Sequence, residues 1–218
     1  MYNQLKAAIL TRQLPPGNQL VENTISERLN VSRTPIRSAI TLLADEGLVD
    51  IVPNKGAFVT NPSRNEIIQA YDLRKNLEIM AAERSINNLS ETDYMELKNT
   101  VKKEKEALIN KNMMGYLKEN ENFHMIFSRK CDNRFLTEYI EKLIKQTSIY
   151  LILFDVYFED SSSQPYGFKE HFEIIELFQQ KDLDQLKTCL TDHFDHAINN
   201  LNIPKEYKNL ASIFETNL

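Results

Sequence analysis

Residues 31–37 read VSRTPIR and directly follow the segment TISERLN at residues 24–30. Ser32 is a residue type that caps helix N-termini, and Pro35 is tolerated in the first turn of a helix. Apolar residues then recur at helical spacing until Gly47 ends the pattern. The stretch therefore predicts a helix capped by Ser32. Its buried stripe is expected to consist of Ile36, Ala39, Ile40 and Leu43.

Two shorter helices are expected before this one. The first lies within residues 2–11, and the turn sequence PPG at residues 15–17 ends it. The second begins with a capping box, in which Thr24 and Glu27 satisfy each other's backbone amides. The residues of the second helix that should face inward are Ile25 and Leu29.

A β-hairpin is expected after the third helix. Residues 48–52 read LVDIV and residues 57–60 read AFVT, two strand-like runs joined by the turn PNKG at residues 53–56. Three helices followed by a hairpin describe a winged helix-turn-helix, whose third helix enters the major groove of DNA.

The start of the third helix carries side chains suited to DNA. Arg33 can bond a guanine bidentately, and Arg37, one turn later, reaches a neighbouring base or a phosphate. Ser32 and Thr34 are short donors suited to phosphate. The alternative is that both arginines are ordinary solvated helix residues, but the winged-helix context favours DNA contacts.

Composition excludes several protein classes. The net charge of −5 excludes a generally basic nucleic-acid coat protein, and residues 1–62 hold six basic against five acidic side chains. Two cysteines are too few for a disulfide framework, and Lys6 and Arg12 interrupt any signal-peptide pattern. The most apolar run, residues 149–158, is too short to span a bilayer and contains Asp155. We expect a cytoplasmic chain with no membrane partner.

A second domain is expected after the hairpin. Only two of the five glycines lie beyond residue 62, and the sequence TNPS at residues 60–63 separates a strand-like from a helical pattern. We place a winged helix-turn-helix domain at 1–62 and an all-α bundle at 63–218, so the fold class is mainly α. The tail after Pro204 is either a short docking helix or a segment exchanged between protomers. The six helices expected in the bundle span about 65–87, 91–110, 113–130, 134–158, 168–180 and 183–200.

All four histidines lie in this second domain. Asn120 and His124 share a face of one predicted helix, while His171 and His193 lie on two others. These helices could converge on a divalent metal site inside the bundle, for which imidazole and oxygen ligands suit zinc first, or nickel, cobalt or manganese. The competing interpretation is that the histidines are isolated residues. His196, on the face of His193, is a spare ligand, an outer partner or simply packed.

Three further charged or polar patterns have simple structural interpretations. Arg74 and Glu78, four residues apart, could form a surface ion pair of little energetic value. The run KKEKE at residues 102–106 is typical of a solvated helix face. The sequence QTS at residues 146–148 is a polar patch on an otherwise apolar helix, and it either lines a pocket or flanks one.

With these motifs in place, the first domain resembles the winged-helix domain of the GntR family of bacterial transcription regulators. The motifs that carry the resemblance are LPPG at 14–17, SERL at 26–29, VSRTPIR at 31–37 and LLADEGLVD at 42–50. The resemblance implies a homodimer on palindromic double-stranded operator DNA. It implies that Arg33 and Arg37 read bases and that the wing tip, Lys55 and Gly56, enters the minor groove. Asn23 stands where some members carry an arginine, so fewer ionic contacts are expected there.

The second domain resembles the all-helical effector-binding domain, called FCD, of the FadR-type subgroup in its metal-binding version. The motifs that carry this resemblance are NFH at 122–124, DN at 132–133, EH at 170–171 and the late His193. The resemblance implies four metal ligands, Asn120, His124, His171 and His193, and it places Arg74 near the effector cavity. The family usually has aspartate where this chain has Asn120. A neutral amide should lower the metal affinity and leave the cation's full charge to attract an anion.

We therefore expect a dimeric DNA-binding transcription regulator, most simply a repressor, that senses a small organic acid through a bound divalent metal. Two alternatives stay open. One is a regulator whose body is a metal-free dimerisation module. The other is a metal-dependent hydrolase, because three histidines on a metal with an open position also suit hydrolysis. No catalytic motif accompanies the histidines, so we expect the chain not to be an enzyme.

Overall fold

The computed structural model describes residues 1–154 and 167–201. Contacts divide the chain into two compact units. The first comprises Met1–Pro62 and Ile149–Leu153, and the second comprises Ser63–Ser148 and the chain from Phe154 onward.

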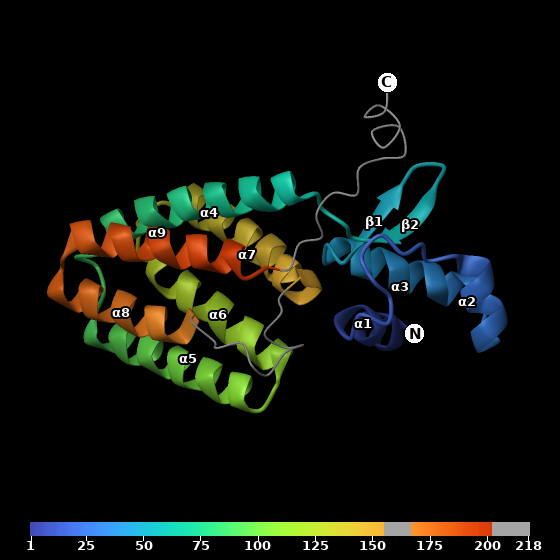
Figure 1. Ribbon diagram of the computed structural model, residues 1–218, viewed down its shortest axis with the longest axis horizontal. Helices are drawn as coiled ribbons and strands as arrows, with labels where there is room; N and C mark the ends of the chain where they lie inside the picture. The colour runs from blue at the N-terminus through green and yellow to red at the C-terminus, as the bar shows by residue number, and fades with distance from the viewer. Residues whose placement is uncertain (155–166, 202–218) are drawn as a thin grey trace, which may run out of the picture. The chain divides into compact units, whose positions relative to one another are not determined.

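The first unit contains the expected winged helix-turn-helix (Figure 1). The hairpin strands are antiparallel, with Val49 opposite Val59 and Val52 opposite Gly56. Both α1 and α2 pack against α3. The elements are α1 (Tyr2–Leu10), α2 (Glu22–Leu29), α3 (Arg33–Asp45), β1 (Val49–Val52) and β2 (Gly56–Val59).

The core of this unit is built on the inward stripe of α3. Ile36 and Leu43 are fully buried, as are Ile9 from α1 and Val59 from β2. Ala39 and Ile40 are buried on the same stripe, which confirms all four residues expected there. Burying this stripe leaves the opposite face of α3 available to a ligand.

Two details of α2 differ from the sequence predictions. The helix begins at Glu22 after Val21, with no side-chain cap, so the capping box at Thr24 is wrong. The backbone N–H of Leu20 donates to the carbonyl of Ala57, and the helix starts directly after this attachment to the wing. Leu29 is 45% exposed, so its inward placement is also wrong. Leu29 is the last residue of the helix, where Asn30 adopts the left-handed conformation and turns the chain away.

The second unit forms an all-helical bundle. The described parts of the six predicted helices match the expected spans, and capping boxes at Ser63 and Ser90 start the first two. Residues 155–158, which end the fourth predicted helix, and the tail after Pro204 lie outside the described residues. Within 1–154 and 167–201, no helix has both the length and the apolar character to cross a membrane. The helices are α4 (Arg64–Ser85), α5 (Glu91–Ile109), α6 (Met113–Ser128), α7 (Arg134–Phe154, of which Ile149–Leu153 belong to the first unit), α8 (Gly167–Gln180) and α9 (Leu183–Asn199).

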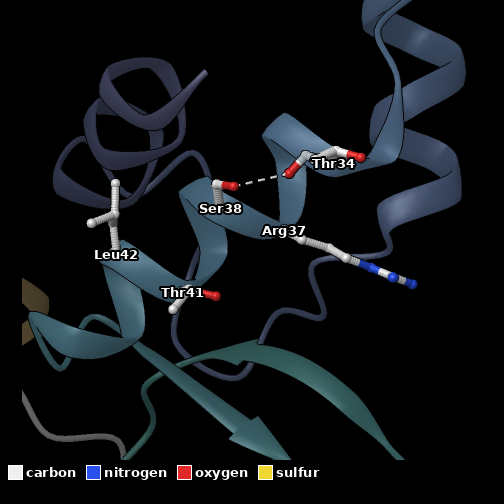
Figure 2. Close-up of a pocket in the computed structure, with 5 residues that line it drawn as sticks. All are labelled: Thr34, Arg37, Ser38, Thr41 and Leu42. Atoms are coloured by element: carbon white, nitrogen blue, oxygen red, sulfur yellow. Dashed lines mark hydrogen bonds between the residues drawn. The ribbon is translucent and has the colours of Figure 1, made fainter.

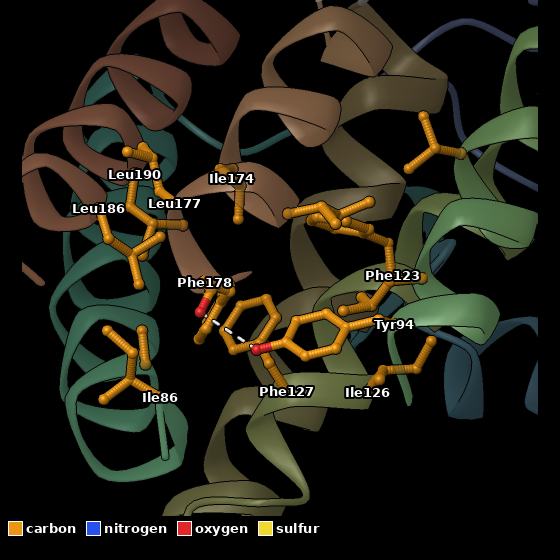
Figure 3. Packing of buried hydrophobic residues seen from close by; sticks show 14 residues of the cluster. Ile86, Tyr94, Phe123, Ile126, Phe127, Ile174, Leu177, Phe178, Leu186 and Leu190 are labelled. Atoms are coloured by element: carbon orange, nitrogen blue, oxygen red, sulfur yellow. Dashed lines mark hydrogen bonds between the residues drawn. The ribbon is translucent and has the colours of Figure 1, made fainter. Parts of the chain in front are cut away.

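An apolar core joins five of these helices (Figure 3). Its largest side chains are the fully buried rings of Phe123 and Phe127 from α6 and Phe178 from α8. The hydroxyl of Tyr94 on α5 donates to the carbonyl of Phe178 at 3.1 Å, which satisfies its polar atom inside the core. Leu186 and Leu190 place α9 against the same cluster. A smaller cluster packs α7 against α4 and α6. This packing fixes the inner faces that carry the polar residues described below.

Replacing Leu97 by alanine should destabilise the bundle strongly. Leu97 is fully buried on α5, whereas Met95 on the same helix is 64% exposed. Leu97→Ala should therefore lower the free energy of unfolding by about 2–5 kcal/mol because it leaves a cavity. The control Met95→Ala should change it by less than about 0.5 kcal/mol. Urea unfolding of both variants tests this, and equal losses would contradict the assigned face of α5.

Candidate functional site

The outer face of α3 presents the side chains expected to read DNA. Ser32, Arg33, Thr34 and Arg37 are all exposed. A hollow lined by Thr34, Arg37, Ser38, Thr41 and Leu42 lies along this face. In Figure 2, Thr34, Ser38 and Leu42 lie on successive turns of α3, and Arg37 extends away from the helix. Ser32 occupies the N-cap position of α3, although its side chain makes no capping hydrogen bond. The hydroxyl of Ser32 is therefore not used to cap the helix and can bond a ligand.

Arg37 forms an exposed ion pair with an acidic residue for which the sequence pattern gives no signal. Its Nε lies 2.8 and 3.0 Å from the two carboxylate oxygens of Glu22, in the first turn of α2. This pair links two helices of the helix-turn-helix and directs the guanidinium outward. The two residues are fifteen positions apart on different helices, so no local pattern identifies the pair.

The wing tip is shaped by backbone conformation and one side chain. Gly56 has a φ of +107°, a region that favours glycine, and Asn54 has a φ of +61°. The amide of Gln19 donates to the carbonyl of Lys55 at 2.8 Å, which ties the turn to the segment before α2. Lys55 and Gly56 are both exposed, so the tip can approach a groove.

Three of the four histidines converge inside the second unit. His124 on α6, His171 on α8 and His193 on α9 each offer one ring nitrogen, and these atoms all lie within 4.8 Å of one another. All three side chains are buried. The convergence expected from the spacing of the histidines is therefore present in the bundle, among the residues that the structure describes.

Each of these imidazoles has a carboxylate behind it. The Nδ1 atoms of His124, His171 and His193 lie 2.6, 2.8 and 2.7 Å from carboxylate oxygens. An ionised carboxylate can only accept hydrogen bonds, so each Nδ1 carries a proton, and in a neutral imidazole the lone pair is then on Nε2. The carboxylates belong, in the same order, to Glu78, Glu104 and Glu170.

The inward Nε2 atoms are suited to a cation. Those of His124 and His171 are buried and have no hydrogen-bond partner among the described residues. Burial holds the pKa of His124 well below its usual value and also lowers that of His193, so both rings are neutral at pH 7. Neutral imidazoles that bond a carboxylate through Nδ1 and aim Nε2 at a common point are the arrangement in which proteins hold metal ions. The residues present therefore fit a divalent cation.

Asn120, the fourth expected ligand, is buried one turn before His124. Its Nδ2 donates to Oε1 of Glu104 at 3.3 Å. The other oxygen of the same carboxylate contacts His171. Asn120 is thus tied to the histidine cluster, with Oδ1 as the amide's only atom able to coordinate a cation.

The position of Glu104 contradicts the prediction made for residues 102–106. That run was expected to be a solvated helix face, but Glu104 is fully buried while its four neighbours in the run are exposed. Glu104 shares a helix face with the buried residues Leu97 and Val101. Its position at that spacing is the signal that could have identified it, and the surrounding lysines concealed it.

Arg74 and Glu78 form a buried ion pair, so the prediction of a surface ion pair is wrong. The Nε of Arg74 donates to Glu78 at 2.6 Å, and both side chains are almost fully buried. Burial alone would raise the pKa of Glu78, but its partners His124 and Arg74 hold that pKa below the usual range. Glu78 therefore remains a carboxylate inside the bundle and links Arg74 to the histidine cluster.

Arg74 also contacts a polar residue of α7. One Nη of Arg74 donates to the hydroxyl of Thr147 at 2.7 Å, and the guanidinium lies 5.1 Å from the centre of the Phe194 ring. The other Nη of Arg74 and the hydroxyl of Ser148 are buried and have no hydrogen-bond partner in the described chain. The polar patch at residues 146–148 thus contributes to the bundle interior.

His196 is an outer partner of the cluster. Its Nδ1 lies 2.6 Å from Oε1 of Glu170, whose other oxygen contacts His193. The side chain of His196 is 57% exposed, and its hydrogen bond to Glu170 raises its pKa. Of the possibilities left open for His196, the geometry favours an outer partner.

Acidic side chains outnumber basic ones around the cluster. Glu78, Glu104 and Glu170 each contact one of the three imidazoles, Arg74 pairs with Glu78, and His196 pairs with Glu170. Negative charge suited to a divalent cation is therefore present one layer behind the imidazoles, although the amide of Asn120 is neutral.

Comparison with known proteins agrees with both units. Residues 1–59 match the model of the gntR family of bacterial regulatory proteins, and residues 69–196 match that of the FCD domain. The HTH-type transcriptional repressor RspR of Escherichia coli (strain K12) is 25% identical over 193 residues, covering 88% of this chain and 83% of RspR. The HTH-type transcriptional regulator YdhC of Bacillus subtilis (strain 168) is 27% identical over 201 residues, covering 92% of this chain and 88% of YdhC.

A solved structure has the same fold. McbR/YncC of E. coli superposes with a TM-score of 0.65 at 22% identity, covering 91% of this chain and 93% of that chain. The relatives are named as regulators, which removes the hydrolase alternative. The chain belongs to the GntR family of bacterial regulatory proteins and carries an FCD domain, so it is a transcription regulator and not an enzyme.

Proposed function

We propose that the chain is a cytoplasmic repressor that binds a palindromic operator as a homodimer and responds to a small organic acid with the help of a divalent metal. Residues 1–62 form the DNA-binding domain, and residues 63–218 form the effector-binding and dimerisation domain. The observation that carries this proposal is the convergence of three buried imidazoles with a carboxylate behind each. Repression is inferred from the relative that is named a repressor.

DNA binding is assigned to the outer face of α3 and to the wing. Arg33 and Arg37 read base edges in the major groove, Ser32 and Thr34 bind phosphate, and Lys55 with Gly56 enters the minor groove. The exposure of these residues supports the assignment.

Dimerisation is assigned to the helical domain. Four large apolar side chains stay exposed on two of its helices. Leu73 and Met80 lie seven residues apart on α4, and Phe135 and Tyr139 lie four apart on α7, so each pair shares one helix face. Apolar surface of this kind favours contact with a second copy of the chain.

A divalent cation, zinc first and nickel or manganese as alternatives, would be held by His124, His171 and His193 with the amide oxygen of Asn120. When bound, the cation supplies positive charge that attracts an acid group to an open position. Glu78, Glu104 and Glu170 keep the imidazoles in the tautomer that presents Nε2. These three glutamates thus orient the imidazoles as metal ligands.

The organic acid is assigned to the buried side chains of Arg74 and Ser148. The buried Nη of Arg74 and the hydroxyl of Ser148 are donors suited to a carboxylate. Glu78 connects Arg74 to His124, so acid and metal act on one hydrogen-bonded chain. Acid binding would then favour a state of the dimer with lower operator affinity, a coupling that acts in both directions.

Arg33→Ala should remove sequence discrimination. The variant loses a bidentate base contact, which costs about 1–3 kcal/mol per half-site and flattens the preference among operators. Lys55→Ala should instead weaken binding to all sequences alike, because it removes only a groove and phosphate contact. Binding of both variants across single-base changes in a palindromic operator, over a series of salt concentrations, tests this. Unchanged discrimination in Arg33→Ala would overturn the assignment of α3.

Acid should destabilise the metal-free protein. The folded pKa of His124 and of His193 lies below the ordinary value, so below pH 6.5 the unfolded chain binds protons that the folded chain does not. The stability is therefore full above pH 6.5 and falls as the pH drops, by up to about 1.4 kcal/mol per pH unit for each such group. Urea unfolding in chelator at pH 7.5, 6.5 and 5.5 measures this. His193→Gln should reduce the loss and His196→Gln should not, because the pKa of His196 is raised.

Metal and acid should bind cooperatively. Calorimetric titration of zinc into chelator-stripped protein, with and without a panel of organic acids, should show that an acid tightens zinc binding by about 5- to 150-fold. Ser148→Ala should keep the zinc affinity and weaken this effect, whereas the control Ser85→Ala, at another buried serine of the domain, should change neither. If wild type holds no zinc at tens of micromolar, or if His171→Ala binds zinc as tightly, the sensor is not metal-assisted and the histidines are structural.

A further inference from the structure

Glu104 connects two of the four residues assigned to the metal. Its Oε2 lies 2.8 Å from Nδ1 of His171, and its Oε1 accepts from Nδ2 of Asn120 at 3.3 Å. Among the described carboxylates near the cluster, Glu78 contacts only His124 of these four residues, and Glu170 contacts only His193. Glu104 comes from α5, which contributes no ligand of its own.

We propose that Glu104 is a positioning residue that replaces the missing aspartate at position 120. One carboxylate on α5 orients both Asn120 and His171 and supplies the negative charge that the amide lacks. The inference rests on the proposed metal site and adds to it a residue whose charge and position set the cation affinity.

The hydrogen bonds make the direction of this effect definite. A carboxylate at position 104 requires donors on both sides, and the amide of Asn120 and the Nδ1–H of His171 provide them. Because Nδ2 of Asn120 faces Glu104, the amide cannot rotate without losing this bond. Oδ1 is then the atom left for the cation.

The geometry also implies that the two positions can exchange their chemical groups. In Glu104→Gln with Asn120→Asp, a glutamine at 104 donates through its amide N–H to the new carboxylate and accepts from His171 through its oxygen. The pair still contains one carboxylate and one amide, so the charge and the number of hydrogen bonds are conserved. Asn120→Asp alone instead places two carboxylates about 3 Å apart, where like charges repel each other.

A double-substitution cycle on the full chain tests the proposal. Zinc affinity is measured at pH 7.5 by competition with a chromophoric chelator for wild type, Glu104→Gln, Asn120→Asp and the exchanged variant. Glu104→Gln should weaken zinc binding by about 10- to 100-fold, the loss typical of removing an outer partner of a ligand. Adding Asn120→Asp to it should restore the affinity to at least that of wild type, because the glutamine at 104 donates to the new carboxylate and that carboxylate is itself a ligand, so the two substitutions are not additive.

Two further measurements separate positioning from general stability. The absorption spectrum of the cobalt-loaded protein should change in Glu104→Gln, since it reports the coordination geometry. Thermal unfolding in chelator should place Asn120→Asp lowest and the exchanged variant near wild type. The matched control is the same pair of substitutions at Glu119 and Asn122, which form a 3.4 Å contact on the exposed side of α6 and should leave zinc binding unchanged.

The outcomes distinguish this inference from the proposed site. Zinc binding by wild type that disappears in His171→Ala supports the site. In that case, an unchanged affinity in Glu104→Gln, or no recovery in the exchanged variant, overturns the role of Glu104 alone. Absence of zinc binding by wild type overturns the metal site and this inference together. If Glu104→Gln does not fold, the exchanged variant decides by direct comparison with wild type: tight zinc binding supports the proposal, and loss overturns it.

Discussion

Burial of two carboxylates, those of Glu78 and Glu104, inside one helical bundle is the constraint on which the second unit depends. A carboxylate removed from water is costly unless it is paired and hydrogen-bonded. Glu78 meets this need with Arg74 and His124, and Glu104 meets it with Asn120 and His171. The two carboxylates and their partners lie on four different helices, α4, α5, α6 and α8, so satisfying the charges fixes how the helices pack. The same contacts decide which ring nitrogen of each histidine faces inward.

The apolar core holds these polar groups in place. The ring of Phe123 stacks on that of His171, with centroids 4.0 Å apart and planes inclined by 19°. Phe123 also belongs to the apolar cluster that joins α4, α5, α6, α8 and α9, so the imidazole plane is set by core packing. The ring of Phe194 on α9 lies against the guanidinium of Arg74. A cation that binds the three Nε2 atoms therefore finds ligands that are already oriented.

The fold was largely predictable from the sequence because helix periodicity, caps and turn residues are local signals. The convergence of His124, His171 and His193 was also predictable, since each lies on an inward helix face. Glu104 and the buried state of Glu78 were not, because their partners are distant in the sequence and neighbouring charges suggested exposure. The error at Leu29 has the same origin: an apolar residue at a helix end is placed by the following turn, and the turn depends on tertiary contacts.

The charge balance of the cluster implies an order of events for the proposed sensor. Without a cation, the carboxylates of Glu78, Glu104 and Glu170 outnumber their basic partners Arg74 and His196, and the excess negative charge repels an organic acid. A divalent cation cancels that excess, and the buried Nη of Arg74 can then attract an acid anion without opposition. Positive coupling between metal and acid follows from the electrostatics of buried residues and does not require a large rearrangement. An aspartate at position 120 would add a fourth negative charge and weaken the attraction for the anion, so the amide of Asn120 favours an acid-responsive site.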